Sequence, residues 1–405
     1  MRKLTRKQKK KLLEILVAII LVIFFGFFDG EETESPTEIT QAPIVTSTPE
    51  RIDNSEEVIT GENEVKTTYS KDKLEVYFFD VGQADCILLR TGKKVMLIDC
   101  GNAGDADLHT RIKNKINLTH ELARLGIEKI HSFVITHAHE DHMGSAYKIL
   151  KMFDVDTLYA NALLPEEEQA KYYERFVEAL ENSDTHFVSP TVLSEKEIKA
   201  EIEEYNAELI AEYEAEVERL KKEGKTEELE ELPEPELLTY HKEDYIWVLD
   251  KIPFGDANIT MIAPNSEEYS DINDTSIVLM VEFDGVNLLL TGDASKQSEE
   301  EILKMAAENQ FDLDCDVLKV GHHGSRTASM EAFIEAISPE YAIVMVAEEN
   351  SYGLPDEDVL ERLERHGTVV YQTKDEGDIK LTIDDGQYEF DFSYSHEVKS
   401  DEDAN

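Results

Sequence analysis

The sequence His-Ala-His-Glu-Asp-His occupies residues 137–142 and brings three imidazoles and a carboxylate into one short stretch. In an extended segment, residues i and i+2 point the same way, so His137 and His139 can reach one metal ion. Asp141 and His142, where the chain turns into a helix, can reach a second ion. Histidine nitrogens with a carboxylate suit zinc, iron or manganese. The stretch predicts a centre for two divalent ions, with zinc as the first expectation and manganese or iron as alternatives.

A second group of polar side chains follows two later apolar runs. Asp293 ends the first run, and His322 and His323 follow the second, which covers 317–320. We expect one of the two histidines to ligate the second ion, and the other to contact the leaving group or act as an acid. The sequence leaves open which does which. A glycine-rich turn ending at Ser325 offers N–H and hydroxyl donors suited to a phosphate oxygen.

Charge and cysteine content restrict the class of protein. The formal charge is −48, although the first 28 residues are strongly basic. Most of the surface should therefore repel nucleic acid, which is normally bound through Lys and Arg. A local basic strip near Lys319 and Arg326 is the expected exception. The three cysteines show no CxxC spacing and are interpreted as small buried hydrophobic residues. They are Cys86, Cys100 and Cys315.

The N-terminal region has the pattern of a membrane signal. A basic flank precedes an apolar run that contains only one charged residue, Glu14, and acidic residues follow. The length is at the short end for a spanning helix, and the basic flank should stay in the cytoplasm. A cleaved signal peptide is the alternative. Both interpretations place the rest of the chain outside the cytoplasm, on the membrane or secreted.

Composition and periodicity divide the chain into five parts. These are a basic flank (1–11), a transmembrane signal anchor (12–28), a disordered stalk (29–70), a globular domain (73–395) and an acidic tail (396–405).

Strand patterns open the globular domain, a helix follows, and the order then repeats. This favours an α/β fold of two sheets covered by helices, a four-layer αββα sandwich. A helical insertion covers about 165–235. Its second segment, 194–232, is amphipathic and carries 15 acidic against 6 basic residues. It is interpreted as a solvated arm, with a lid or a protein-binding surface as the alternative.

The chain resembles the metallo-β-lactamase superfamily and, more narrowly, the hydrolase domain of ComEC-type DNA-uptake proteins and their free-standing relatives. The resemblance covers about 74–385 apart from the arm, and several short matches carry it in the same order. They lie at 79–85, 97–101, 137–142, 289–293, 317–325 and 350–355.

The resemblance implies a dinuclear metal hydrolase of the αββα fold, in which Asp293 bridges the ions. The implied metal ligands are His137, His139, Asp141, His142, Asp293, His322 and His323. Asp141 and His323 are the implied catalytic residues. Residues expected to brace the ligands or line the cleft are Asp80, Gln83, Asp99, Asn273 and Ser325.

Two departures from the superfamily pattern bear on the centre. The interval before Asp293 supplies no further histidine with ligand-like context, since it offers only His186 and His241. An Asn-containing turn, 273–276, stands there as in the ComEC-type relatives, so the first ion is expected to be held more weakly or through water. Leu354 stands where relatives usually have histidine, and one substrate or acid contact is thereby lost.

These features predict a membrane-anchored, extracellular hydrolase, with a phosphodiester as substrate, either DNA or a cell-wall polymer. A lactonase or a β-lactamase-like ester or amide hydrolase is the alternative enzyme. A non-catalytic surface interaction protein, built on a degraded hydrolase scaffold and using the arm to bind a partner, is the alternative from another class.

Overall fold

The structure is a computed structural model that describes residues 73–103, 118–161, 170–235 and 237–392. The expected membrane anchor, stalk and acidic tail lie outside these residues. Among the helices that are described, none combines the length and the apolar character needed to cross a membrane.

Two sheets form the centre of the fold. Within the described residues, the first has nine strands in the order β16-β15-β1-β2-β3-β4-β5-β6-β7. Their bounds are β1 Leu74–Phe78, β2 Ile87–Thr91, β3 Lys94–Ile98, β4 Lys129–Ile135, β5 Asp154–Ala160, β6 His186–Thr191, β7 Tyr245–Trp247, β15 Ile379–Asp384 and β16 Gln387–Asp391. Strands β3 to β7 run parallel, and the remaining pairs are antiparallel.

The second sheet has seven described strands in the order β14-β13-β12-β11-β10-β9-β8. Their bounds are β8 Lys251–Phe254, β9 Ala257–Ala263, β10 Val278–Phe283, β11 Val286–Leu290, β12 Val317–Lys319, β13 Tyr341–Val344 and β14 Val369–Gln372. Strands β11 to β14 run parallel.

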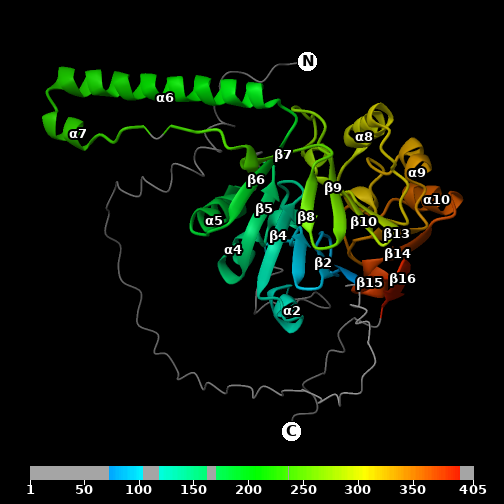
Figure 1. Cartoon of the computed structure of the whole chain (residues 1–405). Coiled ribbons are helices and arrows are strands. Elements are labelled where there is room, and N and C mark those ends of the chain that lie inside the picture. The colour runs from blue at the N-terminus through cyan, green and yellow to red at the C-terminus, as the bar shows by residue number, and fades with distance from the viewer. Residues whose placement is uncertain (1–72, 104–117, 162–169, 236, 393–405) are drawn as a thin grey trace, which may run out of the picture.

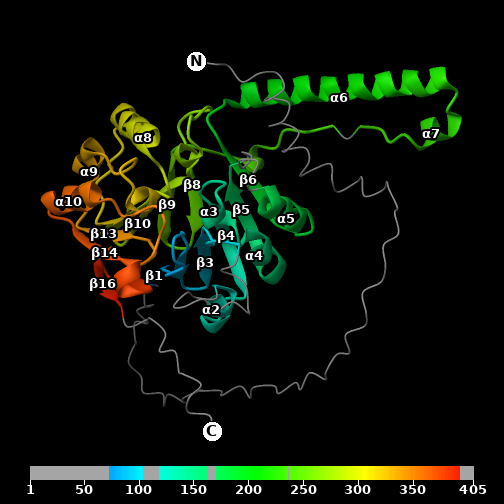
Figure 2. The same cartoon turned by 180° about the vertical axis from the view of Figure 1, so that it is seen from behind.

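Three clusters of buried side chains show that the sheets and helices form four layers. The middle cluster draws on both sheets and includes Val76 and Leu288. A second packs the outer face of the first sheet against helices α2 (Leu118–Arg124), α4 (Ala146–Met152) and α5 (Ala170–Glu181). A third packs the second sheet against α8 (Lys296–Asn309), α9 (Glu331–Ile337) and α10 (Glu357–Arg365). Figures 1 and 2 show helices on both outer sides. The predicted α/β sandwich is therefore confirmed at the level of its sheets and helices.

Parallel strands deliver the polar side chains to one edge of each sheet. Asp99 follows β3, and the histidine stretch follows β4, which is the parallel neighbour of β3. In the second sheet Asp293 follows β11, and the two adjacent histidines follow its parallel neighbour β12. Side chains at the carboxyl ends of parallel strands share one edge, which is where open α/β sheets bind ligands.

Several elements were not predicted from the sequence. The short α3 (Glu140–Met143) and the 3-10 turns η3 (Ile272–Thr275) and η4 (Gly321–Gly324) lie where a helix start and two turns were expected, whereas α4, β5, β7, β8, β16, α11 (Thr373–Glu376) and the 3-10 turn η2 (Lys242–Asp244) were not expected. Most span only three to five residues, too few for a periodic pattern to stand out. Strand β5 begins Asp-Val-Asp-Thr, and these polar residues obscured its strand pattern, although Val155 and the last three residues are buried.

The helical insertion projects beyond the sheets (Figure 1). Its long helix α6 (Glu195–Glu223) begins with a capping box between Ser194 and Glu197, and ends at Gly224 in the left-handed conformation. The short α7 (Thr226–Glu231) follows, and the chain then returns beside α6. The side-chain amide of Asn206 bonds both the N–H and the carbonyl of Leu238, which ties the two halves together.

The distal arm should contribute little to the stability of the body. The residues that α6 buries lie mainly at its first turns, and Leu220 lies near α7. We expect that replacing residues 209–235 by a four-residue Gly-Ser linker shifts the thermal unfolding midpoint of the full chain by less than about 3 °C. Differential scanning calorimetry of both proteins measures this. A loss above about 10 °C would show that the arm belongs to the cooperative core.

Candidate metal centre

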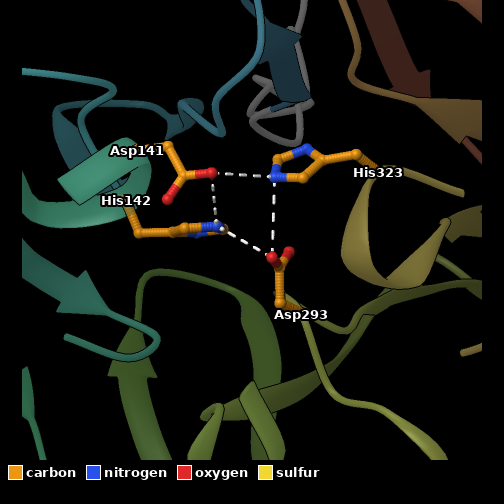
Figure 3. Close-up of side chains that lie close together, drawn as sticks. All are labelled: Asp141, His142, Asp293 and His323. Atoms are coloured by element: carbon orange, nitrogen blue, oxygen red, sulfur yellow. Dashed lines mark hydrogen bonds and ion pairs between the residues drawn. The ribbon is translucent and has the colours of Figure 1, made fainter. Parts of the chain in front are cut away.

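Four side chains from three parts of the chain converge at the shared edge. Asp141, His142, Asp293 and His323 each offer one ligand atom, and these atoms all lie within 4.8 Å of one another. Asp293 Oδ2 is 3.3 Å from His142 Nε2 and 3.5 Å from His323 Nε2. Figure 3 shows the four groups facing a common point. One carboxylate from each sheet and two imidazoles form a donor set that suits zinc, manganese or iron.

The short helix α3 brings Asp141 and His142 into this group. It starts directly after the extended His139, so the chain changes from strand to helix within the histidine stretch. Gly144 follows, and a Cβ placed there would lie only 2.3 Å from the backbone nitrogen of Ala103. Glycine thus allows the loop after β3 to approach α3 closely.

His142 presents a nitrogen suited to a metal ion. Its Nδ1 donates a hydrogen bond to Asp99 Oδ2 at 2.7 Å, which turns Nε2 toward the cluster. That Nε2 is buried and has no hydrogen-bond partner. A buried polar atom without a partner is costly, and a bound cation would remove the cost. A carboxylate behind a ligating imidazole is also the usual support for a metal-binding histidine.

Asp99 braces the histidine loop, as its position after β3 suggested. Its two carboxylate oxygens accept hydrogen bonds from the N–H and the hydroxyl of Thr136, both at 2.8 Å. Thr136 in turn lies against Gly292, where a Cβ would be 2.8 Å from the threonine Cβ. Gly292 also has a positive φ of 53°. The turn before Asp293 therefore requires glycine, both for its conformation and for this approach.

The two adjacent histidines take different places. His323 is buried, and its Nδ1 donates to the carbonyl of Met345 at 2.9 Å, so Nε2 faces the cluster. His322 lies at the rim with a quarter of its side chain exposed, and its Nε2 is 4.0 Å from Asp293 Oδ2. The structure thus brings His323 into the ligand group and leaves His322 outside it.

His137 and His139 form a pair beside the cluster. His137 Nε2 lies 2.9 Å from His139 Nδ1, an arrangement that can offer two nitrogens to one ion. Burial lowers the pKa of His137 well below its ordinary value, which keeps the ring neutral. Among the described residues, no third His, Cys, Asp or Glu atom joins this pair within 4.8 Å. The first position therefore has fewer protein ligands than the second.

The charges around the cluster favour a cation. Burial opposes a proton on His142, but the carboxylates of Asp293, Asp99 and Asp141 together raise its pKa well above the usual value. Burial likewise opposes ionisation of Asp293, but nearby imidazoles and a lysine hold its pKa well below the usual range. The same field that favours a proton at this point favours a divalent ion.

One residue of the centre was misassigned from the sequence. Lys319, the last residue of β12, is completely buried and forms ion pairs with Asp85 and Asp293. The expectation of a basic strip at Lys319 and Arg326 is therefore wrong, because Lys319 does not reach the surface and Arg326 pairs with Asp356. A lysine in a strand that carries an apolar run was the available signal.

The remaining predicted residues lie around the centre rather than in it. The amide of Asp80 donates to Asp378, and Gln83 Oε1 accepts from the amide of Ala347. The hydroxyl of Ser325 accepts from the amide and the hydroxyl of Thr327. The structure does not bring these side chains into the ligand cluster.

The Asn-containing turn before β10 supports the Asp293 loop. Asp274 Oδ1 accepts hydrogen bonds from the amides of Ser295 and Ser298, which fixes the turn against the start of α8. Asn273 is buried, and its Oδ1 has no partner among the described residues. The turn is thus fixed next to the loop that carries Asp293.

His186, His241 and Leu354 lie apart from the cluster. His186 pairs with Asp244 at 3.1 Å on the exposed side of β6, and His241 is exposed. Leu354 is half-buried against the core beneath α8 to α10. The side chain of Leu354 therefore contributes to packing.

Glu299 joins the Asp293 loop to the His323 loop. It lies in the first turn of α8, and its carboxylate accepts from the amides of Ser329 and Met330. Burial raises its pKa to about 8 despite these donors. The buried carboxyl is thus neutral in the folded protein at neutral pH.

This raised pKa predicts a pH-dependent stability. A pKa above the unfolded value of about 4.3 gives stability that is complete below that pH and is lost as the pH rises through about 8. Raising the pH from 5 to 8 should therefore lower the free energy of unfolding of the metal-free protein by about 3 kcal/mol more than it lowers that of the uncharged Glu299→Gln variant. Urea unfolding at both pH values measures the difference. The exposed Glu300→Gln is the matched control, and a variant effect equal at both pH values would contradict the prediction.

Comparisons with known proteins identify the family. The family model of the metallo-beta-lactamase superfamily matches residues 79–347. The chain is 34% identical over 131 residues to "ComE operon protein 3" of Bacillus subtilis (strain 168), a match that covers 32% of this chain and 16% of that protein. It is 32% identical over 146 residues to "Competence protein ComA" of Neisseria gonorrhoeae, covering 36% of this chain and 20% of that protein. The matches thus span a fifth or less of these relatives.

Solved structures give a more distant likeness. The metallo-beta-lactamase fold protein YhfI of Bacillus subtilis aligns with a TM-score of 0.38 and 11% identity, over 79% of this chain and all of that one. CmlA, a diiron beta-hydroxylase from Streptomyces venezuelae, aligns with a TM-score of 0.41 and 13% identity, over 78% of this chain and 55% of that one. These values are too low to transfer any chemistry. The family model covers more than half of the chain, and on that basis the protein belongs to the metallo-β-lactamase superfamily, with relatives among the ComEC-type competence proteins.

Proposed function

We propose that this protein is a metal-dependent phosphodiesterase that acts on DNA or on a cell-wall phosphodiester. The observation that carries the proposal is the cluster of Asp141, His142, Asp293 and His323, with the unpartnered Nε2 of His142 turned into it. Divalent ions bound there would supply an activated water and neutralise charge on the phosphate. The chain's own residues hold those ions and leave a partly exposed rim for the substrate.

The rim carries the groups that would contact a phosphodiester. His322 lies outside the ligand cluster, and its Nδ1 is 2.8 Å from the hydroxyl of Thr327. That hydroxyl lies 3.0 Å from the hydroxyl of Ser325. An imidazole beside two hydroxyls can bind non-bridging phosphate oxygens and exchange a proton with the leaving oxygen. His322, rather than His323, is therefore our candidate for the proton-transfer step.

A lactonase or β-lactamase-like activity has less support. The first metal position has two histidines and no third protein ligand among the described residues. The rim carries a row of polar groups on one side, which begins with His322 and Thr327. A carbonyl substrate requires one oxyanion contact, whereas a phosphodiester presents two non-bridging oxygens. The row of donors thus fits the phosphodiester better.

Charge bears on which phosphodiester is bound. The chain has a net charge of −48, and Lys319 and Arg326 do not form the basic strip expected beside the centre, since Lys319 is buried and Arg326 pairs with Asp356. Binding of long DNA through many phosphates is therefore disfavoured. The DNA alternative is supported by the similarity to competence proteins, whereas the charge weighs against a long polyanionic strand of either kind.

We further propose that the domain acts at the cell membrane, facing outward. The support is the basic flank and apolar run of residues 1–28, which precede the described part of the chain. Basic residues on one side of an apolar segment favour the cytoplasm for that side. A domain that follows such a segment would then meet substrates outside the cell.

The activity is tested with bis(p-nitrophenyl) phosphate, the full chain in detergent, and zinc or manganese. We expect metal-dependent hydrolysis that Asp141→Asn lowers by about 100-fold or more, because changes merely behind a metal ligand already cost about 10- to 100-fold. Glu140→Gln is the matched control, since this exposed neighbour on α3 lies outside the ligand cluster. It should leave the rate within about twofold.

The other outcomes separate the alternatives. Metal binding without phosphodiester hydrolysis, but with lactone or ester hydrolysis, would replace our proposal by the alternative enzyme. No bound metal and no turnover would favour a surface interaction protein that uses the arm. If hydrolysis occurs, single-stranded DNA and a phosphorylcholine-bearing polymer compared at equal phosphate concentration will assign the substrate.

The location is tested by fractionation of cells that express the full chain. We expect it in the membrane fraction, resistant to high salt, and degraded when a protease is added to intact spheroplasts. A version that lacks residues 1–28 should lose membrane association, because the apolar run supplies the anchor. Protection of the full chain from external protease would contradict the outward orientation.

A further inference from the structure

The buried lysine of β12 contacts the carboxylate that the two metal positions would share. Lys319 is 0% exposed, and its Nζ donates to the carbonyl of Gly292 at 3.0 Å and pairs with the carboxylate of Asp85. Its Nζ lies 3.7 Å from Asp293 Oδ1. Burying an ammonium is costly unless it is paired, so this position requires the two carboxylates around it.

The two oxygens of Asp293 therefore face different groups. Oδ2 lies 3.3 Å from His142 Nε2 and 3.5 Å from His323 Nε2, within the ligand cluster. Oδ1 is buried, has no hydrogen-bond partner and faces the ammonium. A carboxylate that bridges two ions through both oxygens needs both of them free, and here the lysine is placed beside one.

The two metal positions are also unequal in their protein ligands. The second position has four groups whose atoms lie within 4.8 Å of one another. The pair His137 and His139 has no third such group among the described residues. A fixed positive charge beside Asp293 further disfavours a second cation there, since like charges repel strongly where water is excluded.

We infer that Lys319 is a positioning residue that keeps Asp293 Oδ1 from binding a metal ion and so makes the affinities of the two metal positions unequal. One divalent ion is held tightly by Asp141, His142, Asp293 and His323. A second ion is held only weakly, at His137 and His139. Lys319 acts through Asp293 and touches no substrate. Asp85 takes part by holding the lysine, and its Oδ1 also lies 3.4 Å from His323 Nδ1. The inference extends the proposed function but concerns metal binding alone, so either can fail while the other stands.

The experiment is a metal titration of the metal-free full chain in detergent with zinc and, separately, manganese. Calorimetry measures the steps, and elemental analysis after gel filtration in metal-free buffer counts the ions retained. We expect about one retained ion per wild-type chain. Asp141→Asn should abolish this retention, whereas His139→Ala should keep it and remove only the weaker step.

The lysine is tested by Lys319→Met, which removes the charge and keeps a long side chain. The dissociation constant of the second ion should fall by about 10- to 100-fold, the size of effect typical for residues behind metal ligands, and retention should rise toward two ions. Lys296→Met is the matched control, because this lysine lies on the exposed surface of α8. A purely structural lysine would lower the unfolding temperature without changing the difference between the two steps.

Several results would overturn the inference. One is tight retention of two ions by the wild type. Another is loss of the retained ion in His139→Ala but not in Asp141→Asn. A third is an unchanged second step in a folded Lys319→Met. If Lys319→Met does not fold, the comparison of His139→Ala with Asp141→Asn decides the order of the two positions alone.

Discussion

The hydrogen bonds of the Asp99 carboxylate are the contact on which the centre depends. Asp99 leaves the end of β3 and binds the N–H and hydroxyl of Thr136 at the end of β4, together with Nδ1 of His142 on α3. Three segments are thereby fixed by one buried group. Because an unpaired carboxylate could not be buried here, the ring of His142 has a single favourable orientation, and its Nε2 must face the cluster.

The architecture makes such a contact possible by placing strand ends together. Each sheet contributes parallel strands whose carboxyl ends share one edge, and the core packed between the sheets holds the two edges side by side. In the second sheet, the same arrangement places Asp293 after β11 and His323 after its parallel neighbour β12. Two buried side-chain carboxyl groups also connect the loops by hydrogen bonds. Asp274 binds the start of α8, and Glu299 on α8 binds the amides of Ser329 and Met330.

Sequence patterns predicted the parts of this arrangement that local spacing determines. The histidine stretch, Asp293 and the placement of the main strands and helices follow from residue type and periodicity. The choice between His322 and His323 could not be predicted, because both follow the same strand. The groups beside Nδ1 of His323, the carbonyl of Met345 after β13 and the carboxyl group of Asp85, come from other parts of the sequence. Lys319 was misassigned for a related reason. Lysine is normally a surface residue, and the carboxylates that allow its burial lie far away in the sequence, at Asp85 and Asp293.

The acidic character of the chain and the composition of the centre have different effects on cation binding. A net charge of −48 concentrates cations of every kind near the surface, including magnesium and calcium, which prefer oxygen ligands. The centre instead combines carboxylates with imidazoles whose free nitrogens point inward, as for His142 and His323. Nitrogen ligands favour zinc, iron and manganese over calcium. The attraction of cations is thus a property of the whole surface. The selection among metal ions depends on the orientations of the His142 and His323 rings, each fixed by a hydrogen bond at Nδ1.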